Sequence, residues 1–216
     1  MRIAISGTEN QNKTKLVDAF LLNWSQYTTP ALSYKDTIEH YISSVEKKGD
    51  LPDSKDVQWA ILNDMVVTQQ SYKVDDKVIF NRCPIDNIIY SLYLNDKDVE
   101  NSGVNDEFIE KCIPVVRESM KDLDIIFTVP LTKVADSKHT DMEQELNSLF
   151  LVMFQESINE YSPFFIHDDR PTIIEVFGTL QERLEMIKMY LDEDGEILGK
   201  VTGILEPNSL DLEMFE

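Results

Sequence analysis

Short apolar runs alternate with longer amphipathic stretches along most of the chain. Runs rich in β-branched and aromatic residues, bounded by polar or turn residues, are typical of buried strands. Five runs are predicted as strands: 3–5, 31–34, 77–80, 123–129 and 172–177. Apolar residues at helical spacing predict helices over 16–24, 38–45, 57–72, 85–94, 108–123, 142–161 and 180–191. Because strands alternate with helices, we expect an α/β domain with a largely parallel sheet.

The end of the chain departs from this alternation. Residues 196–205 could form a small hairpin, and the residues after them are acidic. We therefore expect one domain over residues 1–191 and a small acidic appendage over residues 192–216. Four residues of the last two predicted helices have the spacing of core positions: Phe150, Phe154, Met186 and Met189.

Composition narrows the class of protein. A chain of 216 residues can bury a core without disulfides, and Cys83 and Cys112 show no disulfide or metal-binding pattern. The sequence shows neither a signal peptide nor an apolar run of about 20 residues, so we expect a soluble cytoplasmic protein. A net charge of −20 disfavours nucleic acid as a partner, although a local basic pocket could still accept one polyanion.

The segment between the first predicted strand and the first predicted helix carries the clearest chemistry. Residues 7–14 read Gly-x4-Asn-Lys-Thr, the layout of the Walker A motif G-x-x-x-x-G-K-[ST] in its strand–loop–helix context. Such a loop holds phosphate with successive N–H groups, a lysine on the β and γ phosphates and a hydroxyl on Mg²⁺. The residues expected to bind ATP are Gly7, Asn10, Gln11, Asn12, Lys13, Thr14 and Lys15, with Thr14 as the metal ligand.

Asn12 departs from the motif, which has a second glycine at this position. That glycine normally supplies a positive φ or a close approach to the ligand. Asparagine is the non-glycine residue best suited to the left-handed region, so the loop can still form. A polar turn capped by Thr14, without nucleotide binding, is the alternative.

A second motif follows the third predicted strand. Residues 81–90 read Asn-Arg-Cys-Pro-Ile-Asp-Asn-Ile-Ile-Tyr. With the loop at 7–14, this segment resembles the P-loop nucleoside and nucleotide kinases, particularly the ribosylnicotinamide-kinase-like AAA-type ATPases often encoded by phages. The resemblance covers residues 1–190 through ordered landmarks. It implies that Arg82 contacts a phosphate, and that Asp86 positions the acceptor or the following helix; an exposed ion pair and a surface residue are the alternatives.

Asn81 stands where these kinases have an acid, and asparagine cannot serve as a base. If the reaction needs a base, Asp36 is the best candidate, because the resemblance implies an acceptor-binding acid after the second strand. A helix cap is an equally good interpretation of Asp36.

Two later segments complete the resemblance. The family has a mobile segment after the fourth strand with a cation over the transferring phosphoryl group, and among Lys133, Lys138 and His139 we select Lys138. A solvated polar loop is the alternative. Residues 178–183 match the family's turn near the adenine, which implies that Gly178 and Thr179 lie at the nucleotide; Thr179 and Glu182 also form a capping-box pattern.

The resemblance implies a three-layer P-loop sandwich with five parallel strands in the order 2-3-1-4-5. It also implies an Mg²⁺-dependent kinase that moves the γ-phosphoryl group of ATP to a nucleoside, nucleotide or related small acceptor. Lys13, Arg82 and Lys138 would supply positive charge, and Asp36 would contact or deprotonate the acceptor. A kinase acting on hydroxymethylated pyrimidines in DNA and an inactive nucleotide-binding protein remain alternatives. The oligomeric state, with a homodimer as one option, stays open, and a phage-encoded protein would act in the host cytoplasm.

Overall fold

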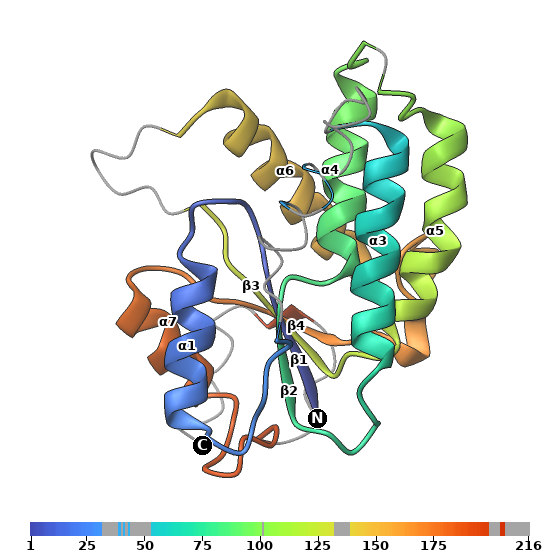
Figure 1. Ribbon diagram of the computed structural model, residues 1–216. Helices are drawn as coiled ribbons and strands as arrows, with labels where there is room; N and C mark the ends of the chain where they lie inside the picture. Colours follow the sequence, from blue (N-terminus) through green and yellow to red (C-terminus); the bar gives the residue numbers. More distant parts are fainter. Residues whose placement is uncertain are drawn as a thin grey trace.

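The computed structural model describes residues 1–31, 39, 41, 43, 53–100, 102–131, 139–198, 204 and 205 (Figure 1). Its strands are β1 (Arg2–Ser6), β2 (Val78–Asn81), β3 (Ile125–Thr128), β4 (Thr172–Glu175) and β5 (Ile204–Leu205). Its helices are α1 (Lys13–Asn23), α3 (Lys55–Gln70), α4 (Pro84–Asp96), α5 (Asp106–Met120), α6 (Asp141–Gln155) and α7 (Leu180–Lys188). Two 3₁₀ turns, η1 (Glu156–Ile158) and η2 (His167–Asp169), complete the described elements.

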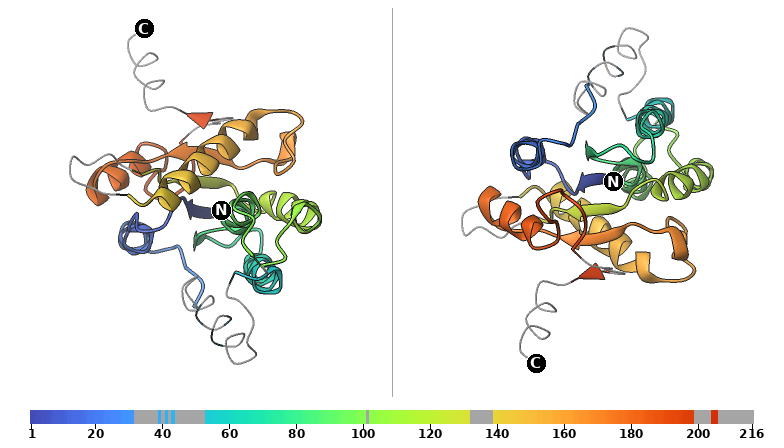
Figure 2. Two further views of the ribbon diagram at one scale, coloured as in Figure 1. Left: turned by 90° about the horizontal axis from the view of Figure 1, so that it is seen from above. Right: turned by 90° about the horizontal axis from the view of Figure 1, so that it is seen from below.

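A parallel sheet forms the middle layer, with the strand order β2-β1-β3-β4-β5. All of β1 is buried, and its side chains alternate between two cores. Ala4 faces the core formed with α3, α4, α5 and α6, while Ile3 and Ile5 face the core formed with α1 and α7. The sheet therefore lies between two layers of helices, as Figure 2 shows, and the predicted α/β class is confirmed.

The predicted strands at 3–5, 77–80, 123–129 and 172–177 are confirmed, and they lie across the sheet in the relative order predicted for them. The five-stranded order of the described sheet nevertheless differs from the predicted one at its edges. In the described sheet β2 is the edge strand on one side, and the fifth strand is β5 on the other. The sequence predicts a hairpin for the residues of β5, whereas they pair in parallel with β4. This strand was missed because it is only two residues long and its partner lies far away in the sequence.

The predicted strand 31–34 lies, apart from its first residue, outside the described residues. Earlier in the chain, Thr28 forms an isolated parallel bridge with Val78 on the outer side of β2. Pro30 follows closely and cannot donate to a ladder, because proline has no backbone N–H.

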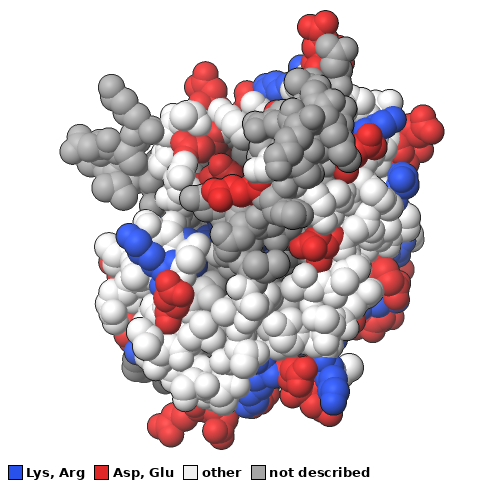
Figure 3. Space-filling model, viewed as in Figure 1, with Lys and Arg blue, Asp and Glu red and all other residues white. Residues whose placement is uncertain are grey.

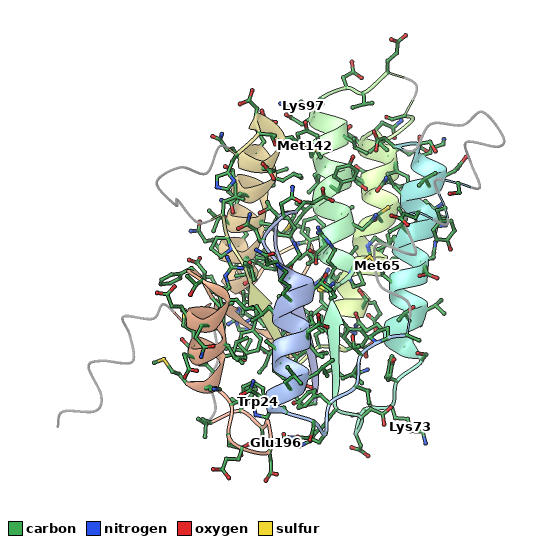
Figure 4. The ribbon with its side chains drawn as sticks, turned by 60° about the vertical axis from the view of Figure 1, so that its left-hand side comes forward. Trp24, Met65, Lys73, Lys97, Met142 and Glu196 are labelled. Atoms are coloured by element: carbon green, nitrogen blue, oxygen red, sulfur yellow. The ribbon has the colours of Figure 1, made fainter. Side chains whose placement is uncertain are left out.

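The turn after α7 packs against the end of α1. The Trp24 indole N–H donates to the carbonyl of Asp192 at 2.8 Å, and the Tyr27 hydroxyl donates to the carbonyl of Gly195 at 2.7 Å. Figure 4 shows Trp24 at the same end of the molecule as Glu196. A domain boundary at residue 191 stays a prediction.

The predicted core positions of the last helices are confirmed in part. Phe150 and Phe154 are buried and Met186 is partly buried, but Met189 is 54% exposed because α7 ends just before it. Cys83 and Cys112 are free and buried. Within the described ranges, no helix has both the length and the apolar character needed to cross a membrane.

Candidate functional site

The loop from Gly7 to Asn12 joins the carboxyl end of β1 to the start of α1. Gly7 has a φ of 128°, and a Cβ atom built on it would lie 2.3 Å from the carbonyl oxygen of Val129. Only glycine fits this close approach between the loop and the chain that follows β3. The sheet thus sets where the loop begins.

Two asparagines give the loop its curvature. Asn10 and Asn12 have φ values of 59° and 56°, both in the left-handed region. Asn12, the position that departs from the motif, therefore adopts the conformation that the missing glycine would supply. Its side chain makes no cap on α1, so the backbone conformation is its visible contribution.

The backbone N–H groups of the loop are available for a ligand. From Thr8 to Lys15 they donate to no acceptor within the described residues, whereas the N–H of Gly7 donates to Asp86 and that of Leu16 to the carbonyl of Asn12. Consecutive unpaired N–H groups at the start of a helix form a concave site for an anion.

The Lys13 side chain is folded into this loop and is buried. Its ammonium group donates to the carbonyl oxygen of Gly7 at 2.8 Å and to that of Thr8. Burial, followed by the positive charge of Arg82, lowers the pKa of Lys13 to about 7, against an opposing effect of Asp86. The positive charge of Lys13 is therefore poorly compensated. An anionic ligand in the loop would stabilise the charged form of this side chain.

The carboxylate of Asp86, in the first turn of α4, connects that helix to the loop. It accepts from the Ser6 hydroxyl at 2.9 Å, from the N–H of Gly7 at 3.3 Å and from the N–H of Cys83 at 3.0 Å. The Arg82 guanidinium donates to it at 3.2 Å. Asp86 is 2% exposed, so the alternative of a surface residue is wrong for it.

Arg82 lies beside the loop in an unusual backbone conformation, with a φ of 81°. Besides Asp86, its guanidinium donates to the carbonyl of Gly7 at 3.3 Å and lies 3.8 Å from the carboxylate of Glu9. Its side chain is only 11% exposed, so it is not the exposed ion pair considered as an alternative. These contacts place the positive charge of Arg82 beside the loop.

Thr14 and Asn81 form the part of the site that suits a metal ion. β1 and β2 are paired with Ile5 opposite Asn81, and the Asn81 amide donates to the Thr14 hydroxyl at 2.9 Å. The described residues contain no group of three or more His, Cys, Asp or Glu side chains that could hold a metal. Hydroxyl and amide oxygens fit Mg²⁺, which takes few protein ligands and completes its shell with phosphate oxygens and water.

Two helices of the later chain contact the loop. The Asn10 amide donates to Glu143 of α6 at 2.9 Å, and Arg183 of α7 donates to the carbonyl of Gln11. These bonds join segments that lie far apart in the sequence, so the loop is held from three sides by α4, α6 and α7.

The structure brings together some of the residues predicted for the site. The loop residues lie with Arg82 and Asp86. Gly178 and Thr179 lie at the start of α7, and Gly178 has a φ of 87°. Thr179 forms a capping box with Glu182, which confirms the capping interpretation of that turn.

Asp36, Lys133 and Lys138 lie outside the described residues, so their roles stay predictions. The Nδ1 atom of His139 lies 4.0 Å from a carboxylate oxygen of Glu143.

Sequence reasoning missed three residues of the site. The Thr8 hydroxyl is buried in the loop and has no hydrogen-bond partner among the described residues. Glu143 and Arg183 reach the loop from other helices, as described above. Thr8 lies within the motif at 7–14 and Arg183 within the matched segment 178–183, although neither was assigned a role, whereas nothing in the sequence joins Glu143 to Asn10.

Comparisons with known proteins agree with this geometry at the level of the fold. No protein-family model matches the chain, and no curated protein matches it. Thymidylate kinase from Candida albicans superposes with a TM-score of 0.59 at 17% identity, over 94% of this chain and 97% of that one. NadR in complex with NR superposes with a TM-score of 0.58 at 12% identity. The match covers 93% of this chain and 52% of the NadR chain.

The chain shares its fold with thymidylate kinase and with NadR. At these identities the likeness establishes the fold alone, and the ribosylnicotinamide-kinase-like subgroup stays a prediction.

The conformation of Asn12 leads to a prediction about the loop. Asn12→Gly should keep or tighten MgATP binding, because glycine adopts a φ of 56° without strain. Asn12→Ala should weaken binding roughly fivefold or more, because a left-handed alanine costs about 1 kcal/mol. Calorimetric titration of both variants measures the difference. A marked loss of affinity in Asn12→Gly would instead assign the Asn12 side chain a ligand contact of its own.

Proposed function

We propose that this chain is an ATP- and Mg²⁺-dependent phosphotransferase of the nucleoside and nucleotide kinase type, acting on a nucleoside, a nucleotide or a related small acceptor. The observation that carries the proposal is the loop itself. Its N–H groups from Thr8 to Lys15 have no acceptor among the described residues, and the buried ammonium group of Lys13 lies against the loop carbonyls of Gly7 and Thr8. A bound triphosphate would satisfy both the N–H groups and the charge.

The residues take roles that follow from their positions. Lys13 would leave the carbonyls of Gly7 and Thr8 and bind the β and γ phosphates, and Thr14 would ligate Mg²⁺ beside Asn81. Bound Mg²⁺ would neutralise charge on the phosphate oxygens. Catalysis by this chain would consist mainly of positioning and charge stabilisation, because phosphoryl transfer requires little covalent chemistry from the protein.

Arg82 would bind a phosphate of the donor or acceptor from its place beside the loop. Of the two roles expected of Asp86, we favour holding α4 and the loop, because its carboxylate already accepts from Ser6, Gly7 and Cys83. Asn81 has no basicity, so a base would come from elsewhere, and we retain Asp36 for that role. Lys138 remains the proposed cation over the transferring group.

Lys13→Met should abolish measurable MgATP binding, because it removes the cation on which the β and γ phosphates would rest. The matched control is Lys121→Met at the end of α5, a partly exposed lysine paired with Glu118. We expect wild-type affinity in the control, measured by calorimetric titration of both variants. Wild-type protein that binds no MgATP, or binding unchanged in Lys13→Met, would refute the proposed function.

Transfer is tested separately from binding by ADP release with nucleosides, nucleotides and hydroxymethylated DNA as acceptors. A nucleoside or nucleotide should stimulate release, and Lys13→Met should abolish the stimulation. Stimulation only by hydroxymethylated DNA would support the DNA kinase instead. The face seen in Figure 3 shows separate Lys and Arg side chains and no continuous basic track. MgATP binding with no release for any acceptor would favour an inactive nucleotide-binding protein.

MgATP affinity should fall as pH rises above about 7, the pKa of Lys13. Below that pH, Lys13 is charged both with and without ligand, so binding takes up no proton at this group. Above it, the free protein holds neutral Lys13 while the phosphates keep the bound lysine charged, so binding takes up a proton and weakens by up to roughly tenfold per pH unit. Titration in buffers of different ionisation enthalpy measures the uptake. A flat affinity from about pH 7 to 9 would contradict this account.

A further inference from the structure

Neither the proposed transfer nor the packing of α7 explains why Arg183 stands at its position in the site. It lies in the first turn of α7 and is only 4% exposed, yet its neighbours Leu184 and Ile187 belong to the apolar core. Its guanidinium donates to the carbonyl oxygen of Gln11. Its Nε has no hydrogen-bond partner within the described residues.

The charge of Arg183 is also uncompensated in the described part of the chain. Its guanidinium has no carboxylate within ion-pair distance there, in contrast to Arg82, which has Asp86 and Glu9. Burial lowers the pKa of Arg183, as expected for a cation withdrawn from water. A buried, unpaired cation costs stability, and an apolar side chain of similar size would pack against the core at lower cost.

The bond to Gln11 has a consequence for the loop. The peptide between Gln11 and Asn12 is planar and trans, so its carbonyl and its N–H point in opposite directions. With the carbonyl held by Arg183 on the side of α7, the N–H of Asn12 must point away from α7. That N–H belongs to the series from Thr8 to Lys15 that has no acceptor among the described residues.

We propose that Arg183 is a positioning residue of the phosphate loop: it fixes the Gln11–Asn12 peptide so that the Asn12 N–H faces the phosphates, and its charge adds to the field that attracts them. This inference rests on the proposed function in taking phosphate as the ligand of the loop. It also gives α7 a role in phosphate binding, separate from the role near the nucleotide expected for Gly178 and Thr179.

The test uses inorganic tripolyphosphate and MgATP as separate probes, titrated into the full chain at about pH 6, where Lys13 is charged. Arg183→Met should weaken the binding of both probes by roughly tenfold or more, because it removes a charge-assisted hydrogen bond and a cation. Arg183→Lys, which keeps the charge without the planar fork, should recover part of the loss. Leu184→Ala is the matched control, because it loosens the same helix without contacting the loop.

Each outcome decides between the two proposals. If Arg183→Met binds both probes as Leu184→Ala does, Arg183 has only a structural role and the inference is wrong. If tripolyphosphate binding depends on Arg183 but no acceptor stimulates ADP release, the inference holds and the transferase proposal fails. If the wild type binds neither probe, both are wrong. Thermal melts of each variant establish that only folded protein is compared.

Discussion

The buried carboxylate of Asp86 is the interaction on which the site depends. It receives hydrogen bonds from the last residue of β1, from the first residue of the loop and from the start of α4, and it pairs with Arg82. A carboxylate buried in this way is stable only when its oxygens are satisfied, so the strand, loop and helix hold one another in a single arrangement. That arrangement fixes where the loop begins relative to β1 and α4.

The charges around the loop contrast with the rest of the protein. The chain carries a net charge of −20, yet Lys13, Arg82 and Arg183 converge on the loop, and in the part of the chain that the structure describes Asp86 is the one carboxylate buried among them. Local positive charge within an acidic protein favours a small polyanion that can enter the site over an extended one that must lie along the surface. This balance supports a free nucleotide in preference to DNA.

Much of the fold could be predicted from the sequence, because the four main strands are runs of buried Ile, Val and Phe that hydrophobic pattern alone reveals. The phosphate loop could be predicted as well, since residue types fix both its chemistry and the left-handed conformation of Asn12. Strand β5 shows the limit of such prediction. Strand pairing depends on which edges the chain brings together, and two paired residues leave no pattern.

The contacts that complete the site could not be predicted, for a related reason. The bond between Asn81 and Thr14 requires the register that sets Ile5 opposite Asn81. The bond between Arg183 and Gln11 joins residues separated by 172 positions. Such contacts are products of the whole fold, whereas motif reasoning reaches only neighbours along the chain.

The central claim, that the N–H groups from Thr8 to Lys15 form a phosphate site, is tested most directly by NMR of their backbone amides. On addition of MgATP, the account predicts shifted resonances and slower hydrogen exchange at these residues, with a smaller response at Lys121 and its neighbours at the far end of α5. Amides of residues 8–15 that remain unchanged while MgATP shifts resonances elsewhere in the protein would contradict it.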